Sequence, residues 1–190
     1  MPATKVDLIF VIDSSASMAP CLEGLVNHIE QLVSPGQGLS LDVRFGLVSH
    51  SVGKSVRGGD LMRMQTLGGS CTELYTSASQ STAEFFTRDA NVFKEGLRKI
   101  TPEGDENSLI ALDIALDHPF EPSSQTRRVV ALFSDETIED GAVSPDQISQ
   151  IPALIEKIHA RRIKLFAAIP LSQAAEQLAE ADGSEIEPVE

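Results

Sequence analysis

The stretch "VDLIFVID", from Val6 to Asp13, is apolar at nearly every position before it ends in an aspartate. A strand buried on both faces shows such a continuous apolar run, whereas a strand with one face in water alternates apolar and polar residues. The stretch "RVVALFSD", from Arg128 to Asp135, has the same character. Strands of this kind belong to mostly parallel sheets covered by helices on both sides. The chain is therefore expected to fold as an α/β protein.

Helical stripes alternate with the strand signals. Two weaker strand signals are "DVRFGLVSH" (42–50) and "KLFAAIP" (164–170). Apolar residues recur at helical spacing within residues 22–33, 93–100, 109–116 and 148–158, and a short final helix is expected over 171–181. Ser144 and Pro145 suit the N-cap and first position of the fourth stretch, which predicts one continuous helix there.

These elements predict a doubly wound, mostly parallel six-stranded sheet with one antiparallel edge strand and helices on both faces. The sixth strand is expected in "SEIEPVE" (184–190), because edge strands tolerate a proline. Residues 51–87 are rich in Gly, Ser and Thr and predict an insertion or elaborated hairpin. Its arms would be "LMRMQTL" (61–67) and an antiparallel edge strand "AEFFT" (83–87). We expect one domain over residues 1–190.

Composition narrows the class of partner and location. The net charge of −13 argues against nucleic acid and anionic membrane as partners, since both favour a positive surface. No apolar run approaches 18 residues, and the start of the chain lacks the cleavage site of a signal peptide. Cys21 and Cys71 show no metal-ligand spacing and require no disulfide framework. A cytoplasmic protein is expected.

Polar residues follow both of the strongest strand signals. Asp13 ends the first strand, with Ser15 and Ser17 at alternate positions after it, and Asp135 ends the "RVVALFSD" strand. Ligands of doubly wound sheets bind outside the carboxyl ends of the strands, where these residues would meet. A carboxylate with two hydroxyls supplies hard oxygen ligands that suit Mg²⁺ or Mn²⁺. The alternative is a capped helix, because Asp and Ser are also preferred N-cap residues.

The motif "DSSAS" at residues 13–17 resembles the Asp-x-Ser-x-Ser signature of the von Willebrand factor type A domain. "LFSDE" resembles the family's aspartate after the fourth strand, and "GDENSLIAL" its loop before an Ala-Leu pair on a helix. The resemblance implies a metal-ion-dependent adhesion site, a MIDAS, formed by Asp13, Ser15, Ser17 and Asp135. In such sites the serines bind the metal directly, the aspartates bind directly or through water, and an open position accepts a carboxylate from a protein partner.

The sequence departs from this family at Glu106, which stands where the family carries a threonine. Glu106 could be a metal ligand, could close the open position as an internal ligand, or could point away while Ser108 or Asp105 helps instead. A first-turn glutamate favoured by the helix dipole is the simplest structural reading. Glu136 follows Asp135 where glycine is common, which favours a partner with basic groups beside its ligand.

Three functional hypotheses follow. The first is a binding module, not an enzyme, that captures a protein partner through a divalent cation. The second is a phosphohydrolase similar to haloacid dehalogenases with Asp13 as nucleophile, although Ser15 stands where these enzymes need a second aspartate and no lysine is well placed. The third is a metal-free scaffold with the same fold. His50, His118 and His159 are expected to be packing or surface residues.

Overall fold

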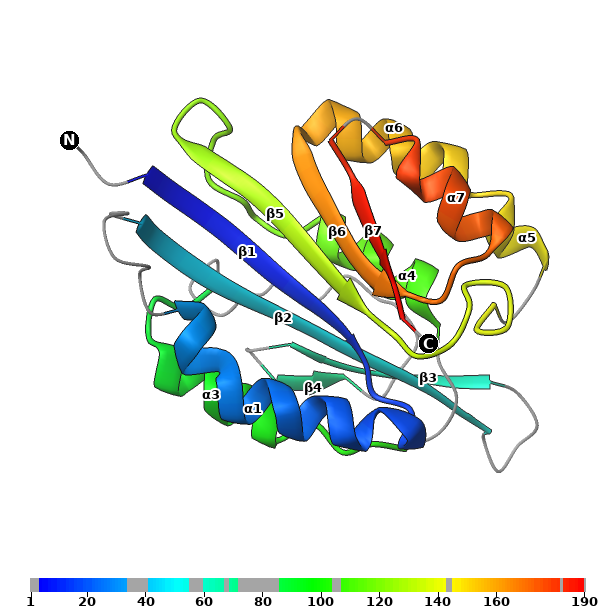
Figure 1. Cartoon of the computed structure of the whole chain (residues 1–190), viewed down its shortest axis with the longest axis horizontal. Helices are drawn as coiled ribbons and strands as arrows, with labels where there is room; N and C mark the ends of the chain where they lie inside the picture. Colours follow the sequence, from blue (N-terminus) through cyan, green and yellow to red (C-terminus); the bar gives the residue numbers. More distant parts are fainter. Residues whose placement is uncertain are drawn as a thin grey trace.

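The computed structural model describes residues 4–33, 41–54, 60–66, 69–71, 86–103, 107–142, 145–181 and 183–189. Seven strands in these segments form one sheet in the order β4-β3-β2-β1-β5-β6-β7 (Figure 1). They are β1 (Thr4–Asp13), β2 (Leu41–Lys54), β3 (Asp60–Thr66), β4 (Gly69–Cys71), β5 (Thr126–Phe133), β6 (Ile163–Ile169) and β7 (Glu185–Pro188). β2, β1, β5, β6 and β7 are parallel. β3 pairs antiparallel with β2, and β4 pairs antiparallel with β3, so β3 alone runs against the other strands.

Helices pack on both faces of the sheet. They are the 3₁₀ turn η1 (Ala16–Met18), α1 (Ala19–Val33), α3 (Ala90–Arg98), α4 (Ser108–Leu116), α5 (Pro145–Ile148), α6 (Ile151–Arg161) and α7 (Gln173–Ala179). α1 and α3 lie together beside β1 and β2, whereas α6 and α7 cover the β6 side of the molecule (Figure 1). None of the helices in the described segments is long and apolar enough to cross a membrane.

The central strand β1 shows why its sequence lacks alternation. Ile9 and Val11 belong to a buried cluster that includes α4, α6 and α7. Phe10 and Ile12 point to the opposite face and pack with α1 and α3, where Phe10 lies 5.1 Å from the ring of Phe93. Both faces of β1 are therefore core, as the continuous apolar run predicted.

The mostly parallel α/β sheet is confirmed, but the predicted number of six strands and the predicted place of the antiparallel strand at the edge of the sheet are not. The described segments contain seven strands, and the one that runs against the others, β3, lies inside the edge formed by β4. β4 is too short to produce a strand pattern. "LMRMQTL" corresponds to β3, and "SEIEPVE" contains the edge strand β7. Of "AEFFT", residues 83–85 lie outside the described residues, and Thr87 makes an isolated antiparallel bridge to Phe45. The side chains of most residues in the predicted insertion at 51–87 likewise lie outside the described part of the structure.

The helix predicted to run continuously through residues 148–158 is interrupted. α5 ends at Ile148, residues 149–150 form a turn, and α6 begins at Ile151 with Pro152 in its first turn. A proline inside a helix removes one backbone hydrogen bond, and its ring collides with the carbonyl four residues earlier. For Pro152 that carbonyl belongs to Ile148, so the helix ends there and restarts.

The order of the strands fixes where a site can form. The chain moves from β1 to β2 on one side of the sheet, and from β5 to β6 on the other. The carboxyl ends of β1 and β5 therefore flank the point at which the winding direction reverses, which is where ligands bind in sheets of this kind. Asp13 is the last residue of β1, and β5 ends two residues before Asp135.

Candidate metal site

The loop after β1 holds the Asp13 carboxylate in a fixed position. Asp13 is completely buried. Its Oδ1 accepts a hydrogen bond of 2.7 Å from the backbone N–H of Ser15, and its Oδ2 accepts one of 2.8 Å from the Ser134 hydroxyl. Ser14 turns away from this carboxylate and donates from its hydroxyl to the carbonyl of His50 at 2.8 Å. Consecutive residues of the motif therefore face different directions, and the alternate residues Asp13, Ser15 and Ser17 face the same side.

The two hydroxyls after Asp13 form a chain of contacts with the loop after β5. Ser15 Oγ lies 3.0 Å from Ser17 Oγ, and Ser17 donates a 3.2 Å hydrogen bond to Oδ1 of Asp135. Ser15 is buried, whereas Ser17 and Asp135 are exposed to solvent. Four of the five predicted ligand residues thus lie together at the carboxyl edge of the sheet, with one side open to solvent.

These oxygens have the spacing of neighbouring ligands around a small hard cation. Mg²⁺ binds oxygen at about 2.0–2.1 Å in octahedral geometry, which places adjacent ligand oxygens about 3 Å apart. The observed separations of 3.0 and 3.2 Å agree with that spacing. The described part of the chain contains no group of three or more His, Cys, Asp or Glu side chains placed to bind a metal.

The local electrostatics also favour a cation. Burial raises the pKa of Asp13, and the negative charge of Asp135 raises it further, although hydrogen bonds from Ser15 and Ser134 partly oppose both effects. The raised pKa means that the charged form of the Asp13 carboxylate is unfavourable here when nothing positive is present, mainly because it is buried. A bound divalent cation would remove that conflict.

A third segment reaches the site through His50. In the β1–β2 register, His50 lies opposite Asp13. Its Nδ1 accepts a 3.2 Å hydrogen bond from the backbone N–H of Asn107, the residue that caps α4 by accepting from the N–H of Ile110 at 3.3 Å. The backbone N–H of Glu103 donates to the carbonyl of Ser14 at 2.8 Å. The chain on both sides of residues 104–106 is therefore tied to the loop after β1.

The remaining candidates fall into two groups. Glu106 and Asp105 lie outside the described residues, while Ser108 is buried as the first residue of α4. Ser134 and His50 contribute to the site although their sequence context gave no sign of it, because both act through hydrogen bonds to residues far away in the chain. His50, predicted to be a packing or surface residue, is fully buried.

Solved structures identify the fold. No family model matches the amino-acid sequence, and no curated protein matches it significantly. The VWA domain of SpRpn10 has a TM-score of 0.59 at 12% identity, over 97% of this chain and 87% of that one. A von Willebrand factor type A protein from Catenulispora acidiphila has a TM-score of 0.58 at 14% identity, over 99% of this chain and 39% of that one.

A third similar structure is proximal thread matrix protein 1 from the mussel byssus, with a zinc-occupied MIDAS motif. It has a TM-score of 0.58 at 14% identity, over 98% of this chain and 44% of that one. The present chain thus spans about two fifths of the length of the Catenulispora and mussel proteins. Three independent likenesses over nearly the whole chain show that it has the von Willebrand factor type A fold.

A pH dependence follows from the burial of His50. Burial lowers the pKa of His50 from 6.5 to about 3. A histidine with a lowered folded pKa stabilises the fold above its unfolded value, and that stability is lost as the pH falls from about 6.5 toward 3. We expect the free energy of unfolding to fall more steeply below about pH 6.5 in the wild type than in His50→Asn, by up to about 1.4 kcal/mol per pH unit. Parallel urea-derived curves for the two proteins would contradict this.

Proposed function

We propose that the chain forms one von Willebrand factor type A domain over residues 1–190, acting as a protein-binding module whose binding depends on a divalent cation. The observation that carries the proposal is the contact chain from Ser15 through Ser17 to Asp135, beside the buried Asp13 carboxylate. It lies at the point of the sheet where ligands of this topology bind. A similar fold with a zinc-occupied MIDAS motif supports it.

Each residue of the site has a distinct part in holding Mg²⁺ or Mn²⁺. The hydroxyls of Ser15 and Ser17 would be direct ligands, and the exposed carboxylate of Asp135 would complete the solvent side directly or through water. Asp13 has both oxygens engaged by Ser15 and Ser134, so it supplies charge and positions the loop, with a remaining lone pair for the metal or its water. The bound cation supplies a positive charge that attracts a carboxylate ligand.

The partner is expected to present an acidic side chain with basic groups beside it. The acidic side chain would complete the metal shell at the exposed side of Ser17 and Asp135. The adjoining loop reads "DETIED" at residues 135–140, and all four of its carboxylate residues are exposed. Lysine or arginine next to the partner's ligand would be attracted to this loop, which favours one orientation of the complex.

The hydrolase alternative is less favoured. A nucleophilic Asp13 would need an oxygen directed at the substrate, but both of its oxygens accept hydrogen bonds, from the backbone of Ser15 and the hydroxyl of Ser134. No cationic residue is among the groups that shift the pKa of Asp13. Ser15, at the position of the required general acid, cannot exchange a proton near neutral pH as a carboxyl group does. These features favour binding over turnover.

Thermal unfolding with and without Mg²⁺ tests the proposal through a matched pair of serine variants. A ligand at a hundredfold excess over its dissociation constant stabilises the folded state by about 2.7 kcal/mol, which raises Tm by about 5–11 °C in a chain of this length. We expect this shift in the wild type and its loss in Ser15→Ala. Ser14→Ala should keep the shift, because its hydroxyl points to His50. Equal shifts in both variants would refute the ligand assignment.

The variant Glu106→Thr distinguishes the three roles that Glu106 could have at the site. If Glu106 is a ligand, the variant binds Mn²⁺ more weakly. If Glu106 closes the open position, the variant binds a small carboxylate such as acetate in the presence of Mn²⁺ whereas the wild type does not. If Glu106 points away, neither quantity changes. Calorimetric titration of both proteins measures them.

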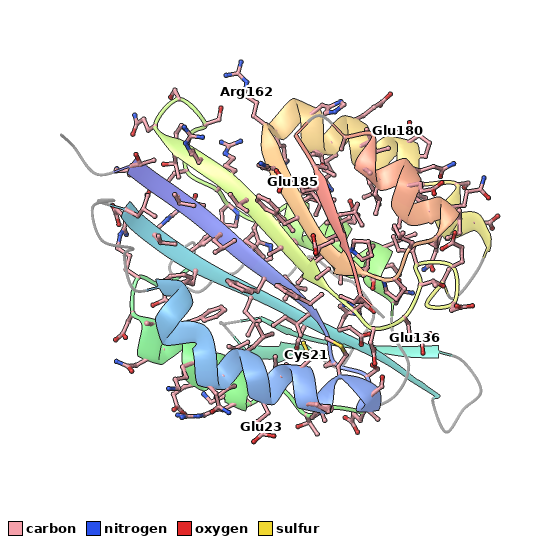
Figure 2. The ribbon with its side chains drawn as sticks, in the orientation of Figure 1. Cys21, Glu23, Glu136, Arg162, Glu180 and Glu185 are labelled. Carbon is pink, nitrogen blue, oxygen red and sulfur yellow. The ribbon has the colours of Figure 1, made fainter. Side chains whose placement is uncertain are left out.

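The thiol of Cys21 provides a second readout of metal binding. Burial raises the pKa of Cys21, and the charges of Asp135 and then Asp13 raise it further. Figure 2 shows Cys21 close to the end of β1, whereas Glu23 projects from the outer side of α1. A cation at the site would lower this pKa and increase the thiolate fraction, up to about tenfold per pKa unit.

In a Cys71→Ser background at about pH 8, we expect Mg²⁺ to accelerate alkylation of Cys21, because alkylation follows the thiolate fraction. Potassium chloride at matched ionic strength is the control for screening. A rate that responds equally to both salts would mean that no divalent cation binds near Cys21.

A further inference from the structure

A basic groove lies at the edge of the sheet opposite to the metal site. Its volume is about 820 Å³, and it forms where β1, β5 and β6 begin. Because these strands are parallel, their amino ends meet at one edge, and their carboxyl ends, with Asp13 and Asp135, meet at the other. The groove is lined by Lys5, Arg127, Arg128, His159, Arg162 and Lys164, together with hydroxyl-bearing residues of the turn before β5.

The charge of this groove is opposite to that of the protein. The chain has 28 acidic and 15 basic residues, yet five of those 15 line this groove, and none of its described lining residues is Asp or Glu. Burial lowers the pKa of Arg128, and the like charges of Arg161, outside the groove, and of Arg162, in its lining, lower it further, whereas Asp7 raises it. The cations of the groove therefore repel one another, and an anion bound among them would relieve that repulsion.

The side chains of two of the cations make no polar contact within the described part of the fold. Arg128 donates to the backbone carbonyls of Glu121 and Arg161, and Lys164 pairs with Glu185 at 2.8 Å. The side chains of Arg127 and Arg162, in contrast, are exposed and make no hydrogen bond or ion pair with any described residue. Figure 2 shows Arg162 projecting from the edge where β6 begins. Both guanidinium groups are available to a ligand.

The backbone at Arg162 gives independent support. Arg162 ends α6 in the left-handed conformation, with φ of 53° and ψ of 47°, and is the one non-glycine residue with positive φ in the described chain. Glycine is favoured at this helix-ending position because it lacks a Cβ, and any other residue is less stable there by about 1 kcal/mol. Arginine at this position therefore lowers the stability of the fold. A role of its side chain in binding a ligand would explain why arginine is present there.

The size and lining of the groove indicate the ligand class. Its volume is that of a small-molecule site, for which about 300–1,000 Å³ is usual. Arginine binds phosphate through two parallel hydrogen bonds, and Ser123, Ser124 and Thr126 add hydroxyls. The described lining has no Phe, Tyr or Trp on which a base could stack. A large polyanion would extend over the acidic surface of a chain with a net charge of −13 and be repelled by it. A small anion would lie close to the cations of the groove, and acidic groups more than a Debye length of about 8 Å away would be largely screened from it.

We propose that this groove binds a small molecule carrying two or more phosphate groups, held by Arg127 and Arg162. The site is separate from the metal edge and does not depend on the function proposed above. Binding there would join a small anionic ligand to a domain whose other edge captures a protein.

Calorimetric titration with pyrophosphate in metal-free buffer tests the groove. We expect saturable binding, weakened about tenfold or more in Arg127→Gln and in Arg162→Gly, since each loses a charge-assisted contact. Arg162→Gly should be folded at least as stably as the wild type, because glycine suits its backbone. Arg98→Gln, an exposed arginine on α3, is the matched control, and Ser15→Ala should bind pyrophosphate normally.

Three outcomes would overturn the proposal. The first is no saturable pyrophosphate binding with a dissociation constant below about 1 mM. The second is equal weakening by Arg98→Gln, which would mean nonspecific charge attraction. The third is malonate binding as tightly as pyrophosphate, which would replace the phosphate compound by a carboxylate ligand such as an acidic peptide.

Discussion

Replacement of Asp7 by alanine is expected to lower the free energy of unfolding by about 3–5 kcal/mol, the usual effect of removing one partner of a buried ion pair. Asp7 lies on β1 and is only 1% exposed. Arg44 of β2 donates to both of its carboxylate oxygens, each at 2.7 Å, and the backbone N–H of Glu121 donates to it at 2.8 Å. The variant would leave the Arg44 guanidinium mostly buried without its main partner.

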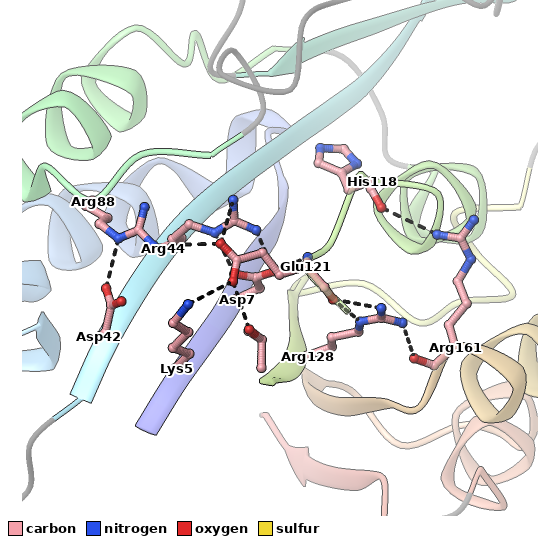
Figure 3. A network of polar contacts seen from close by, with 10 residues as sticks. Lys5, Asp7, Asp42, Arg44, Arg88, His118, Glu121, Arg128 and Arg161 are labelled. Carbon is pink, nitrogen blue, oxygen red and sulfur yellow. Dashed lines mark hydrogen bonds and ion pairs between the residues drawn. The ribbon is translucent and has the colours of Figure 1, made fainter. Parts of the chain in front are cut away.

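Figure 3 shows why no neighbour replaces Asp7. Glu121 contacts Lys5, Arg44 and Arg88 only at 3.5–3.7 Å, so its carboxylate is already shared among three cations. Arg44 also packs over the ring of Phe86, with its guanidinium carbon 4.6 Å from the ring centre, which limits its escape to solvent.

Urea unfolding of Asp7→Ala and Asp42→Ala measures this difference. Asp42 accepts a 2.9 Å hydrogen bond from Arg88, which also lowers the pKa of Asp42, but both partners are partly exposed. Exposed pairs contribute about 0–1 kcal/mol, so Asp42→Ala should lose less than about 1 kcal/mol. Similar losses in the two variants would mean that the Asp7 network is not the stabilising element inferred here.

Asp13→Asn is expected to abolish the metal response while leaving the fold intact or more stable without metal. Burial raises the pKa of Asp13 above its ordinary value of 3.8. For a group with a raised folded pKa, stability is fully present below the unfolded pKa and is lost as the pH rises through the folded pKa. At neutral pH the charged carboxylate therefore opposes folding, and asparagine removes that charge.

The asparagine side chain introduced by this change can still accept from the N–H of Ser15, because its carbonyl replaces Oδ1 of the carboxylate. Its amide can donate to Ser134, whose hydroxyl accepts as well as donates. We expect Mn²⁺ affinity to fall by at least about 100-fold, the upper end of what loss of an outer-shell partner causes. Calorimetry measures the affinity and metal-free urea unfolding the stability. Retained affinity, or a large loss of metal-free stability, would contradict the assignment of Asp13.

The convergence of Asp13, Ser15, Ser17 and Asp135 could be predicted from a local sequence pattern combined with the geometry of a parallel sheet. An unbroken apolar run indicates a parallel strand, and parallel strands bring their carboxyl ends to one edge. The split between α5 and α6 was also predictable in principle, since Pro152 is a local signal that the apolar spacing concealed. The strand count was not, because β4 has only three residues and no apolar pattern.

The supporting contacts could not be predicted for a different reason. Ser134 and His50 act on residues 121 and 57 positions away, and no local pattern records such pairings. The basic groove is an intermediate case. Lys5, Arg127 and Arg162 each lie where a parallel strand begins, so the rule that brought the acidic residues together at one edge applies equally to the basic residues at the other. The net charge of −13 gives no sign of this cluster, because it sums over the whole chain.

The most direct test of the proposed metal site is to identify which amide signals Mn²⁺ broadens in the nitrogen-15 NMR spectrum of the protein. A paramagnetic ion at substoichiometric concentration broadens the amide signals of the residues nearest to it. We predict selective broadening of residues 13–17 and 134–136, reversed by excess Mg²⁺ and absent in Ser15→Ala. Broadening that is confined to other acidic stretches, such as the C-terminal "SEIEPVE", or that persists unchanged in Ser15→Ala, would contradict a divalent cation at the carboxyl edge of the sheet.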